Sequence, residues 1–259
     1  RVETGKNIYF LKWNANTLPG LFEKEAVGLS LLAATKTVIV PEVLAFSERT
    51  NATPAYILLE WLEGSGNADQ ALLGEQLAAL HRSASESAKK QQYGLDHDNY
   101  IGSTPQYNHP EPDWPTFFIQ QRLLPLITLN QQQGRLTPER ITGLEKLIDR
   151  LPDLLNRSSH SPSLIHGDLW SGNVINSPRG LALVDPAASY SDREAEIAYT
   201  ELFGGFNARF YDAYQRVWPL QAGYPERRDL YNLYHLLNHL HLFGESYGYQ
   251  VDLILRRYT

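Results

Sequence analysis

The chain has 259 residues, of which 42% are hydrophobic, and its formal net charge at pH 7 is −6. This length and apolar content suit one large domain or two lobes around a cleft, and they argue against a disordered chain. The sequence has no Lys- and Arg-rich block, no apolar run of bilayer length and no signal peptide at Arg1, so neither nucleic acid nor a membrane is an expected partner. Cysteine is absent, which excludes disulfides and thiolate metal sites and favours a cytoplasmic protein.

The chain begins with a strand and a helix. Residues Asn7–Trp13 alternate with period two and predict a strand with Lys12 near its end. Residues Leu21–Ala34 carry apolar side chains at helical spacing, which predicts a helix. Glu23 and Glu25 lie at the beginning of this helix, so either carboxylate could pair with the strand Lys.

Two more strand signals follow. Residues Thr37–Phe46 predict a connecting segment followed by a strand. The continuous apolar run Ala55–Trp61 predicts a strand buried on both faces. The run ends in the breaker sequence Leu-Glu-Gly-Ser-Gly. Because strands dominate before residue 62 and helices after it, we predict a small β-rich lobe of residues 1–62 and a larger, mainly helical lobe of residues 63–259. The expected fold class is therefore α+β.

Helical patterns dominate the rest of the chain. The predicted helices cover residues 69–83, 114–130, 137–155, 192–203, 207–216 and 226–247. The long polar connection of residues 83–115 is rich in Tyr and Asn, so we expect an ordered segment that packs on the domain rather than a flexible linker. His235, His239 and His241 have no acidic ligand pattern beside them, so they are interpreted as core or surface histidines.

The chemistry of the chain is concentrated at the polar loop His-Gly-Asp-Leu-Trp-Ser-Gly-Asn, residues 166–173, which lies between two short apolar strands. Kinase-type phosphotransferases use an Asp, followed five positions later by an Asn, as the acceptor of the substrate proton and as a magnesium ligand. The next apolar strand ends in Asp185, at the place of a second magnesium ligand. Oxygen donors of this kind suit a hard cation that also holds phosphate. We predict Asp168 as the catalytic base and Asn173 and Asp185 as Mg²⁺ ligands, with ATP as phosphate donor.

This loop also gives roles to the first half of the chain. Lys12 becomes the candidate phosphate-binding residue if a Glu of the following helix pairs with it. The glycine-rich turn that covers ATP phosphates would then be expected ahead of Arg1. The strand exit supplies backbone groups for the adenine edge at Glu60, Trp61, Leu62 and Glu63. Taken singly, each feature has a plainer interpretation as a turn, a solvated Lys or a strand end.

Longer matches extend over nearly the whole chain, and their residues resemble the fructosamine (ketoamine) kinase family. The HGD-x4-N pattern alone is common to many small-molecule kinases, whereas the Leu-Trp-Ser-Gly insert and the Leu-Phe-Gly-Gly-Phe run are more specific. The matching stretches are 22–26, 93–95, 98–102, 104–106, 166–173, 184–187, 192–196, 202–206 and 236–240.

The resemblance implies a two-lobed, protein-kinase-like fold and ATP-dependent phosphorylation of a sugar hydroxyl on a ketoamine, the adduct of a sugar with an amine such as a protein lysine. Phosphorylation would destabilise the adduct and permit deglycation. The resemblance favours Glu25 over Glu23 as the partner of Lys12. It also implies a substrate site shaped by Trp170, in which we include His166, Arg193 and Glu194.

Three alternatives remain at this stage. A choline- or aminoglycoside-type kinase of the same fold stays open, because acidic residues near the loop could surround a cationic substrate; these are Asp192, Glu194, Glu196 and Glu201. A protein kinase is disfavoured, because Pro follows Asp185 instead of Phe-Gly and no Ala-Pro-Glu sequence follows. A nucleotide-binding module without catalysis is the third. Oligomeric state, sugar and amine are not determined by the sequence.

Overall fold

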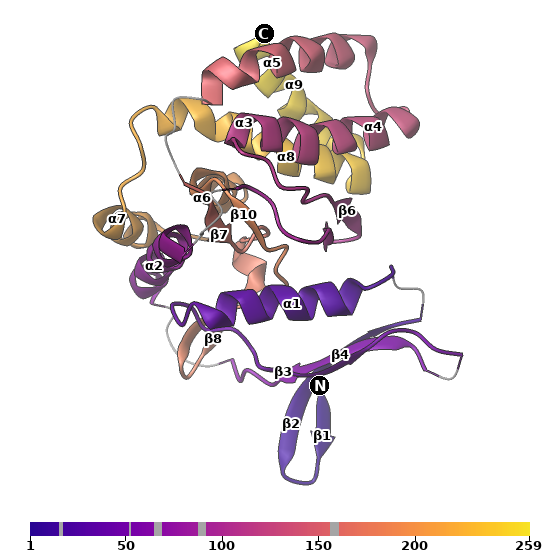
Figure 1. Ribbon diagram of the computed structural model, residues 1–259, viewed down its shortest axis with the longest axis vertical. Coiled ribbons are helices and arrows are strands. Elements are labelled where there is room, and N and C mark those ends of the chain that lie inside the picture. Colours follow the sequence, from indigo (N-terminus) through magenta and orange to yellow (C-terminus); the bar gives the residue numbers. More distant parts are fainter. Residues whose placement is uncertain (16–17, 52, 65–68, 88–91, 156–160) are drawn as a thin grey trace.

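The computed structural model describes residues 1–259 except 16–17, 52, 65–68, 88–91 and 156–160. A twisted sheet with one long helix forms one end of the molecule, and a stack of helices forms the other (Figure 1). Short strands and further helices lie between these two ends. No helix within the described ranges is both long enough and apolar enough to cross a bilayer.

The sheet at the N-terminal end is antiparallel, with the strand order β1-β2-β4-β3. Its strands are β1 (Val2–Thr4), β2 (Asn7–Asn14), β3 (Val43–Ser47) and β4 (Ala55–Glu60). The helix α1 (Leu21–Ala34) has the predicted bounds, and it packs on one face of this sheet. The prediction that β4 is buried on both faces is wrong, because its residues alternate between buried and half-buried and only one face is covered by α1.

A small apolar cluster joins α1 to the sheet. It comprises Phe22, Ala26 and Leu29 from the helix and Ala55, Ile57 and Leu59 from β4. The helical spacing of the first three places them on one face, and the period-two spacing of the last three places them on the facing side of the strand. Leu32, further along α1, belongs instead to the larger core. The helix therefore contacts both halves of the molecule.

The larger half contains most of the helices. They are α2 (Gln70–Ser87), α3 (Trp114–Phe117), the π-helical turn η1 (Phe118–Leu123), α4 (Leu124–Gln132), α5 (Pro138–Leu155), α6 (Arg193–Leu202), α7 (Ala208–Val217), α8 (Tyr224–Phe243), the short turn η3 (Glu245–Tyr247) and α9 (Gly248–Tyr258). The last predicted helix ends at Gly244, whose φ of 90° breaks it, and α9 was not predicted. The predicted connection 83–115 contains the hairpin β5 (Asn99–Ile101) and β6 (Thr104–Gln106).

Two antiparallel strand pairs carry the central loop. The strand β7 (Ser163–Ile165) pairs with β10 (Ser189–Ser191), and β8 (Val174–Ser177) pairs with β9 (Gly180–Leu183). The turn η2 (Ser171–Asn173) precedes β8. The Leu183 N–H donates to the Ile39 carbonyl at 2.8 Å, which ties β9 to the segment leading into the small sheet. The strand ends therefore face α1 and β2 across a cleft.

Candidate active site

The loop between β7 and β8 depends on one glycine. Gly167 has a φ of 85°, and a Cβ at this position would lie 2.1 Å from the Ala187 carbonyl oxygen. The Ala187 N–H donates to the His166 carbonyl at 2.9 Å, so the chain before β10 lies directly against the loop. Any larger residue at 167 would push these segments apart. This packing fixes the backbone conformation from which the Asp168 side chain projects.

Asp168 and Asn173 are joined as their spacing predicts. The Asn173 Nδ2 donates to the backbone oxygen of Asp168 at 2.8 Å and to its carboxylate Oδ2 at 3.1 Å. Burial raises the pKa of Asp168 above its ordinary value, while neighbouring His166 and donors from Tyr199 and Asn173 oppose that shift. The carboxylate is thus desolvated but oriented, which suits a proton acceptor.

Lys12 meets two carboxylates across the cleft. Its Nζ lies 2.8 Å from Glu25 Oε1 and also contacts Asp185 Oδ1. Burial alone would lower the pKa of Lys12, but Glu25 and Asp185 raise it overall, so the ammonium remains charged. Asp185 has a φ of 58°, a left-handed conformation that is uncommon for a residue with a side chain and is found at functional sites.

These residues line a cleft of about 470 Å³. Its walls include six of the predicted site residues, which are Lys12, Glu25, Asp168, Trp170, Asn173 and Asp185. Asp185 and Asn173 can direct a carboxylate and an amide oxygen toward the same space, because Asn173 uses its nitrogen for Asp168. This donor set fits Mg²⁺, which prefers oxygen ligands together with substrate phosphates.

The predicted substrate role of His166 is not supported. His166 has no exposed surface, and its Nε2 hydrogen-bonds to the Val184 carbonyl at 2.9 Å. Its ring therefore links the loop to the segment that carries Asp185. His166 positions the loop from beneath and cannot touch a substrate in the cleft.

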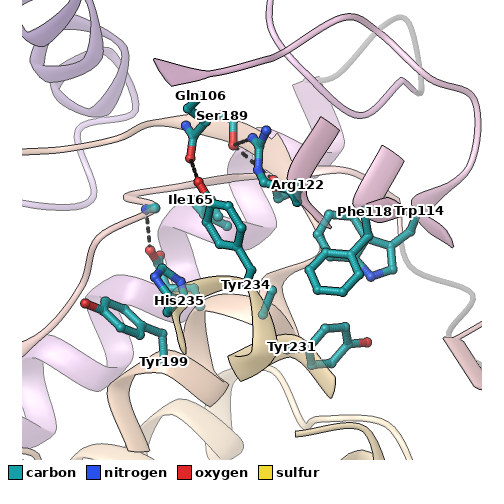
Figure 2. A pocket seen from close by; sticks show the side chains of 14 residues that line it. Gln106, Trp114, Phe118, Arg122, Ile165, Ser189, Tyr199, Tyr231, Tyr234 and His235 are labelled. Atoms are coloured by element: carbon teal, nitrogen blue, oxygen red, sulfur yellow. Dashed lines mark hydrogen bonds between the residues drawn. The ribbon is translucent and has the colours of Figure 1, made fainter. Parts of the chain in front are cut away.

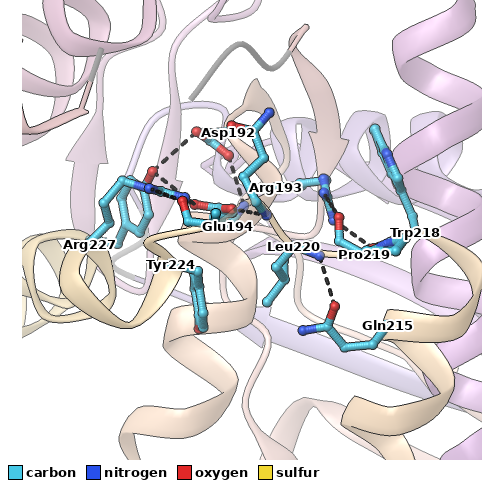
Figure 3. A network of polar contacts seen from close by, with 12 residues as sticks. Asp192, Arg193, Glu194, Gln215, Trp218, Pro219, Leu220, Tyr224 and Arg227 are labelled. Carbon is cyan, nitrogen blue, oxygen red and sulfur yellow. Dashed lines mark hydrogen bonds and ion pairs between the residues drawn. The ribbon is translucent and has the colours of Figure 1, made fainter. Parts of the chain in front are cut away.

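Arg193 and Glu194 do not line the cleft and belong instead to a buried network of polar contacts (Figure 3). The Arg193 guanidinium donates to the carbonyls of Trp218 (3.0 Å) and Pro219 (2.6 Å) and lies 4.0 Å from the Trp218 ring centroid. Glu194 accepts two hydrogen bonds from Arg227, at 2.9 and 2.7 Å. Their exposed fractions are 1% and 0%, so the predicted substrate contacts are corrected to a structural role.

Glu196 is the residue whose importance the sequence did not reveal. Its Oε1 accepts from the Gly167 N–H at 2.7 Å, and its Oε2 accepts from the His166 N–H at 3.1 Å and from His81 Nε2 at 2.9 Å. Burial lowers the pKa of His81, so this ring donates as a neutral imidazole. Burial alone would raise the pKa of Glu196, but the His81 hydrogen bond and the other donors lower it overall. An ionised Glu196 therefore clamps the catalytic loop. The only sequence signal was its place in the 192–196 stretch.

The predicted adenine-binding segment lies outside the lining of this cleft. The Glu60 carboxylate pairs with Arg179 at 2.9 Å, and the Glu60 N–H donates to the Glu42 carbonyl at 2.9 Å. Among the described residues, no hydrogen bond involves the backbone of Trp61, Leu62 or Glu63. Those groups remain available to a ligand, whereas the amide of Glu60 is not.

Trp170 is half-exposed at the mouth of the cleft, with its ring folded over Gly172. A Cβ at Gly172 would lie 2.2 Å from Trp170 Cη2, so only glycine allows this arrangement. A set of contacting rings, here called the aromatic cluster, lies just after α6 and on α8 and η3; it comprises Phe203, His239, Phe243 and Tyr247. His239 is close enough to Asp168 to influence its pKa. His239 is half-buried in the aromatic cluster, whereas His235 is buried, and the sequence did not distinguish the two.

Comparison with known proteins gives a consistent result over the full chain. The fructosamine kinase family model matches residues 1–259. A "Probable ketoamine kinase" of Enterococcus faecium is 41% identical over 259 residues, covering 100% of this chain and 90% of the relative. A chloroplastic protein-ribulosamine 3-kinase of Arabidopsis thaliana is 38% identical, covering 95% of this chain and 74% of the relative.

Solved structures agree with this result. A protein from Thermobifida fusca, named as a fructosamine-3-kinase, superposes with a TM-score of 0.86 at 35% identity, covering 96% of this chain and 85% of the other. An aminoglycoside phosphotransferase superposes with a TM-score of 0.61 at 18% identity, covering 98% of this chain and 89% of the other. The second likeness shows the fold alone, and it confirms the predicted kinase-like architecture.

Proposed function

The chain belongs to the fructosamine kinase family, and we propose that its phosphoryl transfer takes place in the cleft between Lys12 and Asp168. The protein is a kinase that uses ATP to phosphorylate a sugar hydroxyl of a ketoamine. The observation that carries the placement is the convergence of Asp168, Asn173, Asp185 and Lys12 on one cleft.

Asp168 acts as the base. Its carboxylate lies at the cleft surface and is held by Asn173, so one oxygen can accept the proton of the attacking hydroxyl. Phosphoryl transfer needs little covalent work from the protein, because positioning and neutralisation of charge supply most of the rate enhancement. The acceptor hydroxyl gives its proton to Asp168 as its oxygen bonds to the γ-phosphorus of ATP, and the bond from that phosphorus to the bridging oxygen breaks, which releases ADP.

Lys12 binds the phosphates and Glu25 orients it. Asp185 and Asn173 would hold Mg²⁺, which would neutralise charge on the phosphate oxygens. In the structure, Lys12 occupies the space beside Asp185, which places one ammonium within reach of the phosphates that the metal ligands would face. Backbone groups of Trp61, Leu62 and Glu63 are proposed to contact the adenine edge. We propose the lobe boundary at residue 62, where the composition changes from strands to helices.

The acceptor lies between Trp170 and the aromatic cluster. An aromatic ring can stack on the apolar face of a sugar; Trp170 lines the same cleft as Asp168, and His239 of the cluster is close enough to Asp168 to influence its pKa. The acids that a cationic acceptor would require are already engaged: Asp192, Glu194 and Glu196 are buried and hydrogen-bonded. Glu201 accepts from the Tyr224 hydroxyl at 2.8 Å. These four carboxylates therefore offer no site for the several ammonium groups of an aminoglycoside, and the stacking surface of Trp170 supports a ketoamine as the acceptor.

The proposal also covers the amine to which the sugar is attached and the cell compartment in which the reaction takes place. The half-exposed Trp170 leaves the mouth of the cleft open, which would admit a sugar attached to a protein lysine as well as a small ketoamine. Phosphorylation of such an adduct would support deglycation in the cytoplasm.

The test replaces Asp168 with an isosteric amide. Asp168→Asn should lower kcat by about 10² to 10⁴ with a defined ribulosamine or fructosamine as acceptor, because the amide cannot accept the proton. Binding of ATP and the thermal unfolding midpoint should stay near the wild-type values. Asp153→Asn, an exposed position on α5, is the matched control and should keep full activity. Near-normal turnover by Asp168→Asn would remove this carboxylate from the role of base.

A further inference from the structure

The β5–β6 hairpin holds the segment that follows Asp185. Gln106 and Asn99 lie directly opposite each other in this hairpin, so both side chains leave the same face of it. The Gln106 Nε2 donates to the Ala187 carbonyl at 3.0 Å, and the Asn99 Nδ2 donates to the Ala188 carbonyl at 2.9 Å. Two successive backbone carbonyls, just after the proposed metal ligand, are thus bound by side chains that lie about eighty residues earlier in the chain.

We infer that Gln106 and Asn99 are positioning residues, which fix the backbone after Asp185 and so the direction of its carboxylate toward Mg²⁺. Asp185 needs this support, because its φ of 58° is a left-handed conformation that persists only where the surroundings hold it. Before it, the Val184 carbonyl accepts from His166 Nε2 at 2.9 Å, so the chain is held on both sides of this residue. The inference rests on the proposed role of Asp185 as a metal ligand.

The hydrogen bonds of the two amides give each side chain one orientation. The Tyr234 hydroxyl donates to Gln106 Oε1 at 2.8 Å (Figure 2), which leaves the Gln106 nitrogen for the Ala187 carbonyl. The same nitrogen donates to Asn99 Oδ1 at 2.8 Å, so the Asn99 nitrogen is left for the Ala188 carbonyl. An amide whose oxygen and nitrogen have different partners cannot flip without losing its hydrogen bonds.

A buried cation belongs to the same network. The Arg122 guanidinium donates to Asn108 Oδ1 at 2.8 Å and to the Ser189 hydroxyl at 3.1 Å (Figure 2). The Asn108 Nδ2 in turn donates to Asn99 Oδ1 at 2.9 Å. Burial lowers the pKa of Arg122 to about 10, so the guanidinium stays charged at neutral pH and strengthens the hydrogen bonds that it donates. Residues 187–189 are therefore each bound by a side chain from the segment 99–122.

The catalytic loop has a second support, so effects on the metal ligand and on the loop can be separated. Ala187 also donates its N–H to the His166 carbonyl, but the Glu196 carboxylate holds the N–H groups of His166 and Gly167 independently. Loss of the bonds from the hairpin should loosen the backbone at Asp185 more than that of the loop. The affinity for Mg²⁺ should therefore change more than the rate at saturating Mg²⁺.

The test replaces Gln106 with an apolar side chain of similar length. Gln106→Met should raise the free Mg²⁺ concentration for half-maximal activity about tenfold and lower kcat at saturating Mg²⁺ less than threefold, because excess metal restores the complex. Asn130→Leu is the matched control. Its buried Nδ2 also donates to two backbone carbonyls, those of Leu126 and Leu237 at 2.8 and 2.9 Å, so it removes comparable hydrogen bonds and should leave the Mg²⁺ dependence unchanged.

A second readout needs neither metal nor turnover. In the ligand-free protein, backbone amide hydrogen exchange of the peptide 184–190 should be several-fold faster in Gln106→Met than in the wild type, and unchanged in Asn130→Leu. Tyr234→Phe is a milder variant that removes only the donor to the Gln106 oxygen. It should shift the Mg²⁺ dependence in the same direction by about two- to threefold, even if Gln106→Met does not fold.

The failures of the two proposals differ. A loss of kcat with wild-type Mg²⁺ dependence in Gln106→Met and Tyr234→Phe would mean a purely structural role and would overturn the inference. Wild-type hydrogen exchange of the peptide 184–190 in Gln106→Met would also overturn it. If Asp185→Asn keeps the wild-type Mg²⁺ dependence, the proposed metal ligand fails instead.

Discussion

At the scale of single residues, the site depends on charged side chains that are partly buried and paired with one another. Lys12 is 23% exposed and Glu25 12% exposed, and they form an ion pair whose ammonium also reaches Asp185. Breaking such a half-buried pair costs more than losing an exposed one, because the remaining carboxylate is left without a partner. The same arrangement keeps one positive charge aimed at the position of the phosphates.

Lys12→Met should therefore affect both binding and stability. We expect a loss of at least about 100-fold in kcat/KM for ATP, because the phosphates lose their ammonium. We also expect a decrease of about 1–3 kcal/mol in the free energy of unfolding, because Glu25 is left unpaired. Steady-state kinetics and urea denaturation measure the two effects. Lys146→Met, at an exposed position on α5, should change neither. Unchanged ATP kinetics in Lys12→Met would exclude Lys12 as a phosphate ligand.

Trp170 tests the acceptor side separately. Trp170→Leu should raise the KM for the ketoamine about three- to tenfold, with the KM for ATP unchanged, because the stacking surface for the sugar is lost. Initial rates with each substrate varied in turn give both constants. Tyr249→Leu, a similarly exposed aromatic position on α9, is the control. If both KM values rise together, Trp170 is supporting the loop and not the sugar.

At the scale of elements, α6 organises the catalytic loop more than any strand does. Asp192 caps its N-terminus by accepting from the Glu194 N–H at 2.9 Å, which sets where the helix begins. Glu196 and Tyr199, three residues apart, then fall on the face that meets the loop. A chain of hydrogen bonds continues from Glu196 through His81 to Tyr214, so α2 and α7 support the same contact.

Glu196→Gln should loosen this element. An amide oxygen can replace one carboxylate oxygen, but the amide N–H₂ would face the donors that now bond Glu196, so we expect a loss of about 3 kcal/mol in unfolding free energy. The folded-state pKa of Glu196 lies below its ordinary value, so its contribution is fully present above the unfolded-state pKa and is lost as pH falls through the folded pKa. The difference between wild type and variant should thus be large at pH 7 and shrink below about pH 4. Urea denaturation of both proteins across this pH range tests the prediction. A stability difference that does not change with pH would contradict an ionised Glu196 that holds the catalytic loop. Glu145→Gln, exposed on α5, is the control.

At the scale of the molecule, the two halves meet through contacts on several sides of the cleft. The Tyr100 hydroxyl, from β5 of the larger half, donates to the Pro19 carbonyl at 2.9 Å, just before α1. The Lys24 ammonium lies 4.6 Å from the centroid of the same ring. These contacts fix the beginning of the helix that carries Glu25, and so act on Lys12 at a distance.

Tyr100→Ala should raise the KM for ATP several-fold with little loss of stability, because α1 can then shift relative to the larger half. Tyr100→Phe keeps the cation–π contact and removes one exposed hydrogen bond, so its effect should stay below about threefold. Kinetics and thermal unfolding of the two variants form the comparison. Equal effects from both would assign the whole contribution to the hydroxyl and contradict a role for the ring.

The sequence by itself determined what depends on local spacing. The period of apolar residues defined α1 and β2, and the predicted helices 192–203 and 207–216 correspond to α6 and α7. The HGD-x4-N loop identified Asp168 and Asn173, and the apolar strand after it identified Asp185. These features follow from interactions between residues close in the chain, so a pattern of a few residues is enough to predict them.

The tertiary structure decided which polar residues face the cleft and which are buried. Arg193, Glu194 and Glu196 read alike as polar residues at the start of a helix, yet the first two bind a distant loop and α8, and the third holds the catalytic loop. Tyr199 and His235 meet only because α6 packs against α8. Such choices depend on partners that lie tens of residues away, and local periodicity carries no information about the direction in which a helix turns its polar side chains within the packed molecule.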